Sequence, residues 1–459
     1  MDYLTAKVAY PKLTLYAFHL YKNLANDSKP VENANHLWEK CQEIGKKLDI
    51  PKLENLSIPE NQQLNKNKGF IEFTAIKHQK NLHLSGEINR LLIHDTYALD
   101  LTFRYPHSEI ELPKLKGLNQ DDCLLASNIK ATLGQTLVFF AQPLEIINDE
   151  KGFADACVKT LISESKFNQL NLSCQNQGKL LNSRIFEYNN DADSPQKQCH
   201  ILIWLNTNQQ TTDSENTEKF YYPLIDLLNC RSKIIYARYK SRCCYHEARE
   251  EYSKLEEKVN RFNNLKDNSA NAKFKEFNQW LNEIPAISFN YSRCLRDLQL
   301  HKATIQTNIK NYKLYLDKIK KLCNQDNLEF LSSFVELAED TFIEQINTDL
   351  AYLTPGQSLF EQLLQSIRGI VEIEQTKRDR KLNTTINTIG IGFGGGAIIS
   401  GVVTQHSGIV VKQIDKIKQP VDLYLLFNKP LHPFYASLFI SIAATLFFTL
   451  IGWLASRRK

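Results

Sequence analysis

The chain has 459 residues and a formal net charge of +5, from 56 basic and 51 acidic side chains. Residues 377–459 hold 11 of the basic and 3 of the acidic side chains, which leaves 45 basic against 48 acidic, or −3, for residues 1–376. A body without a net positive charge does not attract phosphates, so we expect no nucleic-acid partner.

The ten cysteines all precede residue 324, and none belongs to a CxxC pair. This usage is typical of free thiols in a reducing compartment rather than of a secreted disulfide framework. The first sixteen residues lack a basic segment followed by an apolar core, so we expect no signal peptide. The body of the chain is therefore expected in the cytoplasm.

The first 215 residues are predicted to form an α+β domain with a mixed sheet. Leu82–Leu92 and Tyr97–Tyr105 flank a short turn at residues 94–96, which is the clearest hairpin pattern in the chain. Further β-rich runs occur at Leu13–Phe18, Phe70–Ile76, Leu137–Phe140, Gln169–Cys174, Arg184–Tyr188 and Cys199–Leu205, and helical periodicity occurs at Val31–Leu48 and Phe153–Ser163. The polar segment Thr207–Thr217 is predicted to be a linker.

Residues 216–381 are predicted to form an all-α stalk or bundle domain, because Pro and Gly nearly vanish and apolar residues recur every three or four positions. Helices are predicted at about 220–265, 272–284, 286–322 and 328–353, with a break at Pro285. A last helix is expected to begin at Thr354-Pro355 and to continue unbroken into the segment that follows residue 381.

Two charge-free segments predict a C-terminal transmembrane hairpin. Residues 382–406 and 431–456 contain no Asp, Glu, Lys or Arg, and about 20 apolar residues suffice to cross a bilayer. The plan then comprises a transmembrane helix at 382–406, an external loop at 407–430, a transmembrane helix at 431–456 and a basic cytoplasmic tail at 457–459.

Basic residues indicate the orientation. Seven lie beside the hairpin's outer ends, at 377–381 and 457–459, whereas the loop between the spans carries four lysines. The positive-inside rule therefore predicts a multi-pass protein of the bacterial inner (plasma) membrane, with its N- and C-termini in the cytoplasm. The lipid bilayer is accordingly an expected partner.

A cytoplasmic α+β domain, long helices, a helix that runs into the first of two C-terminal spans, and a basic tail together resemble the plan of the CorA family of divalent-metal transporters. That family ends its first span with a Gly-Met-Asn signature, whereas this chain reads SGVVTQHSG at residues 400–408 and its only methionine is Met1. No filter residue is therefore carried over. The chain is more similar to an uncharacterised bacterial group of CorA-like membrane proteins, some relatives of which are thought to act in antiviral defence.

Small and polar residues repeat along the first predicted span. Glycines at such spacing let helix backbones approach closely, which predicts a helix-packing face and a homo-oligomer formed through this helix. Hydroxyl and amide side chains could instead line a narrow pore around a symmetry axis. The residues assigned to pore or packing are Thr384, Thr385, Asn387, Thr388, Gly392, Gly396, Ser400 and Thr404.

Two clusters in the helical domain are candidate binding sites. Arg231, Arg238 and Arg242 fall on one helix face, which fits either an anion such as a phosphate-bearing second messenger or an ordinary solvated face. Cys243, His246 and Glu250 are weak candidates for a divalent metal, since three ligands from one helix close a tetrahedral site poorly. No cofactor is otherwise predicted, and no catalytic signature is present, so we do not expect an enzyme.

Two functions fit these observations. The first is a CorA-like oligomeric membrane channel or transporter, of unknown ion substrate, that is gated by its cytoplasmic domain. The alternative is a non-conducting, membrane-anchored signalling, scaffold or defence-effector protein.

Overall fold

The computed structural model describes residues 3, 5–23, 26–58, 70–75, 82–106, 109–264, 270–323 and 326–414, together with individual residues between 442 and 454. Of residues 387–414 it describes the backbone alone. The chain divides into two compact units. The first comprises Met1–Lys254 and Ile287–Ser358, and the second comprises Leu255–Ala286 and Leu359–Lys459.

The first unit contains a nine-stranded sheet with the order β4-β5-β6-β1-β8-β11-β10-β9, and β7 also pairs with β1. Its strands are β1 (Lys7–Leu20), β4 (Ile71–Thr74), β5 (Ser85–Ile93), β6 (Thr96–Arg104), β7 (Ile110–Glu111), β8 (Gly134–Pro143), β9 (Ser173–Leu180), β10 (Ser183–Asn189) and β11 (Ile201–Leu205). A small separate sheet joins β2 (Lys22–Asn23) and β3 (Asn26–Pro30). Strands β8 and β11 are parallel while their neighbours pair antiparallel, which confirms the predicted mixed sheet.

The predicted hairpin is confirmed as β5 and β6. Ile93 pairs with Thr96, which leaves His94 and Asp95 as a two-residue turn. His94 has a φ of 56°, the left-handed conformation that short hairpin turns require. The Asp95 carbonyl accepts hydrogen bonds from the backbone of Tyr21 and Lys22, at 2.8 and 3.2 Å, so the turn is tied to the end of β1.

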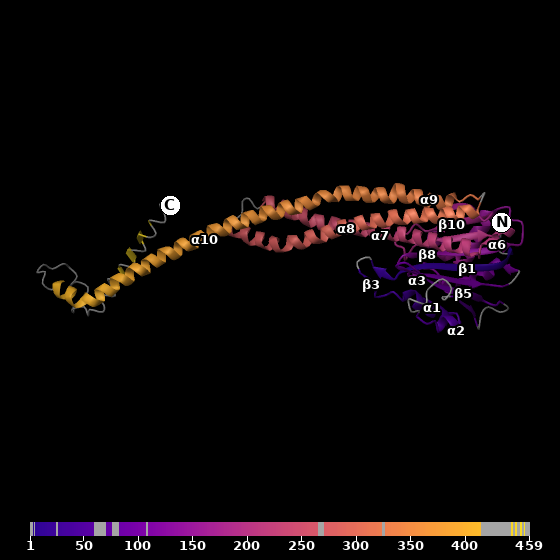
Figure 1. Cartoon of the computed structure of the whole chain (residues 1–459), viewed down its shortest axis with the longest axis horizontal. Coiled ribbons are helices and arrows are strands. Elements are labelled where there is room, and N and C mark those ends of the chain that lie inside the picture. Colours follow the sequence, from indigo (N-terminus) through magenta and orange to yellow (C-terminus); the bar gives the residue numbers. More distant parts are fainter. Residues whose placement is uncertain are drawn as a thin grey trace. The chain divides into compact units, whose positions relative to one another are not determined.

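Both faces of this sheet are covered at β6, because every residue from Thr96 to Phe103 is buried. Alternate side chains point to opposite faces. Leu99, Leu101 and Phe103 join an apolar core. The elements on that side are α1 (His36–Lys47), α2 (Pro51–Glu54), η2 (Leu112–Asp122), α3 (Ala126–Ile129), α4 (Glu150–Leu161) and α5 (Glu164–Gln169). The opposite face meets α7 (Glu218–Asn264), and Figure 1 shows α1 and α2 on the other side of the sheet from α7.

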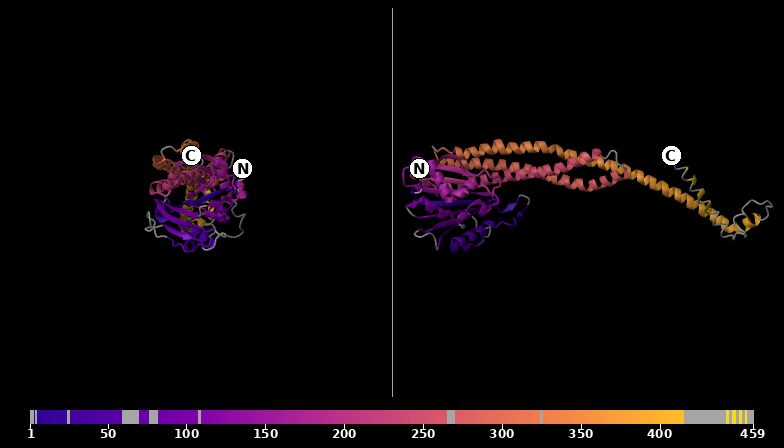
Figure 2. Two further views of the ribbon diagram at one scale, coloured as in Figure 1. Left: turned by 90° about the vertical axis from the view of Figure 1, so that its right-hand side faces the viewer. Right: turned by 180° about the vertical axis from the view of Figure 1, so that it is seen from behind.

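The remaining helices are α6 (Gln209–Ser214), α8 (Ala270–Leu322), α9 (Glu329–Leu337), the π-helix η4 (Ala338–Ile343) and α10 (Glu344–Ile414). In the first unit, α7 and α8 lie together on one side of the sheet, as Figure 2 also shows. The Tyr312 hydroxyl of α8 donates to the Leu331 carbonyl of α9 at 3.0 Å, and its ring lies 5.6 Å from that of Phe334. The long helices and the α+β region are thus present as predicted.

Three predicted helix boundaries are wrong. Helix α8 continues through Pro285, and α10 begins at Glu344 and continues through Pro355. Proline removes one backbone hydrogen bond, but packing on both sides maintains these helices: Ile284 and Tyr291 are fully buried. The Thr354 hydroxyl donates to the Leu350 carbonyl at 2.6 Å, so Thr354 lies inside the helix rather than capping it. The predicted helix at 328–353 is interrupted by η4.

The second unit has its own apolar core, contributed by parts of α7, α8 and α10. Its buried side chains include Leu255, Phe277, Trp280, Ile284, Phe360, Leu363, Ile367 and Val371. Ion pairs flank this core, with Lys258 joined to Glu283 at 2.5 Å and Arg261 joined to Glu276. Arg378 stacks on Phe274, with the guanidinium 4.0 Å from the ring centre.

The predicted membrane architecture is contradicted. Among the residues that the structure describes, no helix combines the length and the apolar character needed to cross a bilayer. The side chains of α10 are described as far as Ile386, and this part carries charges along its length, including the basic cluster at 377–381. The span predicted at 431–456 and the tail at 457–459 fall largely or wholly outside the described residues.

This finding overturns three predictions. The transmembrane hairpin, the multi-pass inner-membrane location with cytoplasmic termini, and the membrane and channel assignments all required spans that the described helices do not supply. The predicted continuity of the helix beyond Pro355 is confirmed, because α10 runs without a break to Ile414.

Candidate functional site: a polar row beneath α7

A row of polar side chains crosses the sheet on the face that α7 covers, and we call it the polar row. In β5, β6, β1 and β8 its members are paired in register, with Asn89 opposite Asp100, Asp100 opposite Tyr16, and Tyr16 opposite Thr136. Glu187 of β10 pairs with Asn176 of β9. His200, just before β11, completes the row, whose members are Asn89, Asp100, Tyr16, Thr136, His200, Glu187 and Asn176.

The half of the row at β8 to β10 is a chain of hydrogen bonds. The Thr136 hydroxyl lies 2.8 Å from Nδ1 of His200, and Nε2 of His200 lies 2.9 Å from Glu187 Oε1. Asn176 donates to the other oxygen of Glu187 at 2.8 Å. All of the polar atoms of Glu187 and His200 therefore have partners, as buried polar groups require.

Protonation states follow from these contacts. Burial alone would raise the pKa of Glu187, but the hydrogen bond from His200 and the charge of Arg231 lower it to about 2. Burial, with the charge of Arg231, lowers the pKa of His200 to about 4. Glu187 is then ionised and His200 neutral at neutral pH, so Nε2 carries the proton that binds Glu187 and Nδ1 accepts from Thr136.

A hydroxyl, an imidazole and a carboxylate in this order also form the core of hydrolase triads. Here the Thr136 hydroxyl would have to meet a substrate, yet Thr136 is only 1% exposed and His200 only 3%. A neutral imidazole could accept the Thr136 proton, but substrate has no approach to the oxygen. The arrangement therefore fits a structural network rather than a nucleophile.

Helix α7 contacts the polar row near both ends of the row. The Tyr221 hydroxyl donates to Asp100 Oδ2 at 2.6 Å and accepts from Asn89 at 3.0 Å. Ten residues later, the guanidinium of Arg231 lies 3.8 Å from Glu187 Oε1, and both side chains are about nine-tenths buried. A third link joins Lys233 to Asp95 in the β5–β6 turn.

The predicted arginine face is a packing face toward α9, η4 and α10. The guanidinium of Arg231 lies 4.9 Å from the ring centre of Phe334, and that of Arg238 lies 4.2 Å from Phe342 in η4. Arg242 forms an ion pair of 2.6 Å with Asp349, whose side chain is 3% exposed. Anion binding by these arginines stays a prediction, although Arg231 and Arg242 already hold internal carboxylates.

The candidate metal ligands are not brought together. His246 and Glu250 are exposed on α7, whereas Cys243 is half-buried. Across the part of the chain that the structure describes, no three His, Cys, Asp or Glu side chains are close enough to bind a metal ion. All ten cysteines are free.

The pore or packing residues lie on α10. The hydroxyls of Thr384 and Thr385 donate to the carbonyls of Arg380 and Lys381, each at 2.8 Å, and both residues are exposed. For Asn387, Thr388, Gly392, Gly396, Ser400 and Thr404, the side chains lie outside the described part of the structure. Their role stays a prediction.

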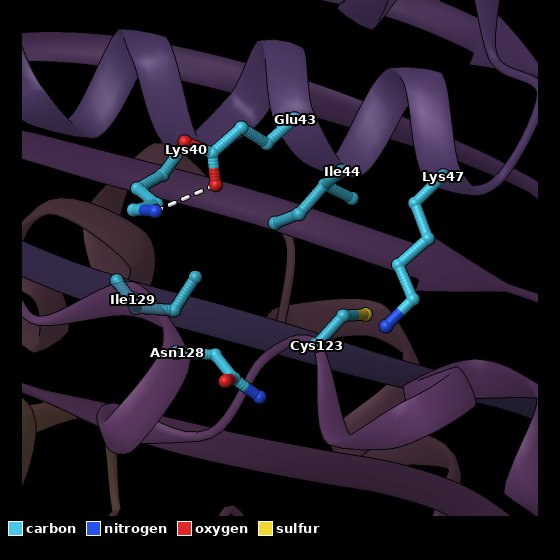
Figure 3. Close-up of a pocket in the computed structure, with 7 residues that line it drawn as sticks. All are labelled: Lys40, Glu43, Ile44, Lys47, Cys123, Asn128 and Ile129. Carbon is cyan, nitrogen blue, oxygen red and sulfur yellow. Dashed lines mark hydrogen bonds and ion pairs between the residues drawn. The ribbon is translucent and has the colours of Figure 1, made fainter.

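A pocket of about 160 Å³ opens between α1 and the segment around α3, and Figure 3 shows two lysines at its rim. Lys40 pairs with Glu43 at 2.6 Å and Lys47 with Asp121 at 3.4 Å, so the positive charge is compensated. Burial raises the pKa of Cys123 to about 12, which keeps that thiol protonated and unreactive. Pockets that bind organic ligands are usually about 300–1,000 Å³. The polar row is thus the better candidate.

Sequence reasoning missed the polar row. Its members come from seven strands or strand ends that are adjacent in the sheet but are spread from Tyr16 to His200 in the chain. One signal was available: each of Asp100 and Glu187 is an acidic residue between two large apolar or aromatic neighbours in a buried part of its strand.

The comparisons with known proteins found no matching family model, no matching curated protein and no matching solved structure. The resemblance to the CorA family and the predicted homo-oligomer therefore stay predictions.

Proposed function

We propose that the chain is a non-catalytic signalling or scaffold protein in which helix α7 responds to the state of the sheet. One observation carries the proposal: α7 binds the polar row near both ends, through Tyr221 and through Arg231. These residues are separated by about 15 Å along the helix. Strands β6 and β10 are four strand spacings apart, or about 19 Å. Because α7 is bound to both β6 and β10, a change in the relative position of these strands should displace the helix.

Arg231 extends the connection to the next layer. Its guanidinium contacts Glu187 on the sheet side and the ring of Phe334 on α9. Seven and eleven residues later, Arg238 and Arg242 contact η4 and α10 from the same helix face. A displacement of α7 therefore changes its packing against α9, η4 and α10, which could present an altered surface to a partner.

The π-helix η4 supports this role. Single π-helical turns are rare, and they are frequent at functional sites because they interrupt the regular hydrogen bonding of a helix. In this chain, η4 separates α9 from α10 and includes Phe342, on which Arg238 stacks. The element that would respond to α7 thus departs from regular α-helical hydrogen bonding.

The Tyr221→Phe variant tests the proposed transmission. Loss of the hydroxyl removes the hydrogen bonds that Tyr221 makes to Asp100 Oδ2 and to the Asn89 amide, which should cost about 1–3 kcal/mol. We expect amide hydrogen exchange, followed by mass spectrometry, to become about tenfold faster or more both in residues 218–242 of α7 and in α9. Tyr352→Phe, which alters a tyrosine 78% exposed on α10, should leave both segments unchanged. If exchange becomes faster only in the first turns of α7, the helix does not transmit the change to α9.

A further inference from the structure

Asp100 is the acidic group of the polar row that lacks a cationic partner in the described part of the structure. Tyr221 donates to it at 2.6 Å and Thr102 at 3.3 Å, and both donors are neutral. Lys12 of β1 is near, but its ammonium group binds Glu215. By contrast, Glu187 at the far end of the row has Arg231.

The charged and titratable groups near Asp100 come from β5, β1, α7 and the segment between α6 and α7. Glu87 of β5 and Lys12 of β1 act on it with opposite sign, and the Tyr221 hydroxyl of α7 binds it directly. Tyr16 of β1 lies opposite it in the register, and its pKa is raised by burial and by the charge of Asp100. Glu215 contributes negative charge but is paired with Lys12. Ionisation of Asp100 is therefore opposed by burial and only partly compensated.

We propose that Asp100, Tyr221 and Asn89 form a proton-controlled latch, which holds the first turns of α7 on the sheet when Asp100 is protonated and loosens when Asp100 ionises. The proposal rests on the proposed function, because it names what regulates the contact between α7 and the sheet. A protonated Asp100 is neutral and keeps the Tyr221 hydrogen bond without a buried charge. When Asp100 is ionised, separation of α7 from the sheet lowers the free energy of the carboxylate, because water then solvates it.

The direction of the effect follows from linkage. Burial raises the pKa of Asp100 to about 6 with α7 in place, while hydrogen bonds from Tyr221 and Thr102 oppose the shift. With α7 released, the carboxyl meets water and returns toward its ordinary value of 3.8. The closed latch thus binds a proton more tightly than the open latch, so closure is strongest at low pH and weakens as the pH rises through 6.

Hydrogen exchange across a pH series tests the latch. After correction for intrinsic exchange rates, the opening equilibrium of residues 219–226 should increase about tenfold between pH 5 and pH 8 in the full chain. Asp100→Asn, which is neutral at every pH, should show no increase. Glu218→Gln alters an exposed acid in the first turn of α7 and should keep the increase of the unaltered chain.

Tyr221→Phe serves as a second variant if Asp100→Asn folds poorly. Without the hydroxyl that stabilises the ionised carboxylate, the pKa of Asp100 should rise further, so the pH dependence should move to higher pH. A flat profile in the unaltered chain, or an equal slope in Asp100→Asn, would overturn the latch. The proposed function is tested separately, by whether exchange in α7 and α9 becomes faster together in Tyr221→Phe at a single pH. Failure of the latch and failure of the proposed function are therefore distinguishable.

Discussion

Replacing Arg231 by Met should lower the free energy of unfolding by about 3–5 kcal/mol, because it leaves the ionised Glu187 buried without its only cation among the described residues. Methionine retains most of the apolar contact with Phe334, so the loss reports mainly on the charge. Chemical denaturation monitored by tryptophan fluorescence, to which Trp204 in β11 contributes, measures it.

Arg238→Met is the matched control. Arg238 lies on the same face of α7 and also stacks on a phenylalanine, but it makes no ion pair among the described residues. Its replacement should cost less than about 1 kcal/mol. In Arg231→Met, the pKa of His200 should also rise, since the charge of Arg231 helps to lower it. Equal losses in the two variants, with an unchanged His200 titration by NMR, would show that Glu187 does not depend on Arg231.

Acidification from pH 7 to pH 4 should destabilise the first unit by several kcal/mol. Burial lowers the pKa of His200 and of His19 from 6.5 to about 4 in each case. The unfolded chain therefore binds protons that the folded chain rejects, so stability is lost as the pH falls from about 6.5 to 4. Each histidine contributes on the order of 3 kcal/mol to this loss of stability. Asp100 acts in the opposite direction, because its raised pKa makes the folded state bind a proton more tightly, and it offsets about one of these contributions.

Single replacements separate these contributions. His19 is fully buried, its Nε2 lies 2.9 Å from the Asn33 carbonyl, and its Nδ1 lies 2.7 Å from the Thr132 hydroxyl. His200→Gln and His19→Gln should each flatten the decline of stability between pH 6.5 and 4, although both lower stability at pH 7. His246→Gln, at an exposed site on α7, should change neither slope nor stability. A slope that survives both replacements would mean that other groups govern acid unfolding.

Local patterns in the sequence were sufficient to predict the hairpin of β5 and β6 and the long helices, because alternation and helical periodicity are short-range signals. The common face of Arg231, Arg238 and Arg242 was also predictable from spacing alone. Its partners were not, since Phe334, Phe342 and Asp349 lie about 100 positions away and on other helices. The spacing of the arginines is the same whether the face binds internal partners or an external anion, so the sequence does not distinguish the two.

The polar row depends on the order of strands, which local patterns do not determine. Strand β1 lies between β6 and β8, so Tyr16 meets both Asp100 and Thr136. The predictions at Pro285 failed for a related reason: tertiary packing maintained a helix that local preference would end. The membrane prediction counted residues without charge, whereas crossing a bilayer also needs a long helix of sufficient apolar character, which no helix among the described residues supplies.

Native-state hydrogen exchange of the unaltered chain, at several low concentrations of denaturant, tests most directly whether α7 and the sheet act as one unit. The slowest amides of α7 between residues 227 and 242, which follow the proposed latch, and those of β6 and β10 should converge on one opening free energy and one denaturant dependence, because Arg231 binds Glu187 of the same sheet. If this part of α7 instead exchanges through a separate opening of lower free energy while β6 and β10 stay protected, the helix is an independent layer and the account is contradicted.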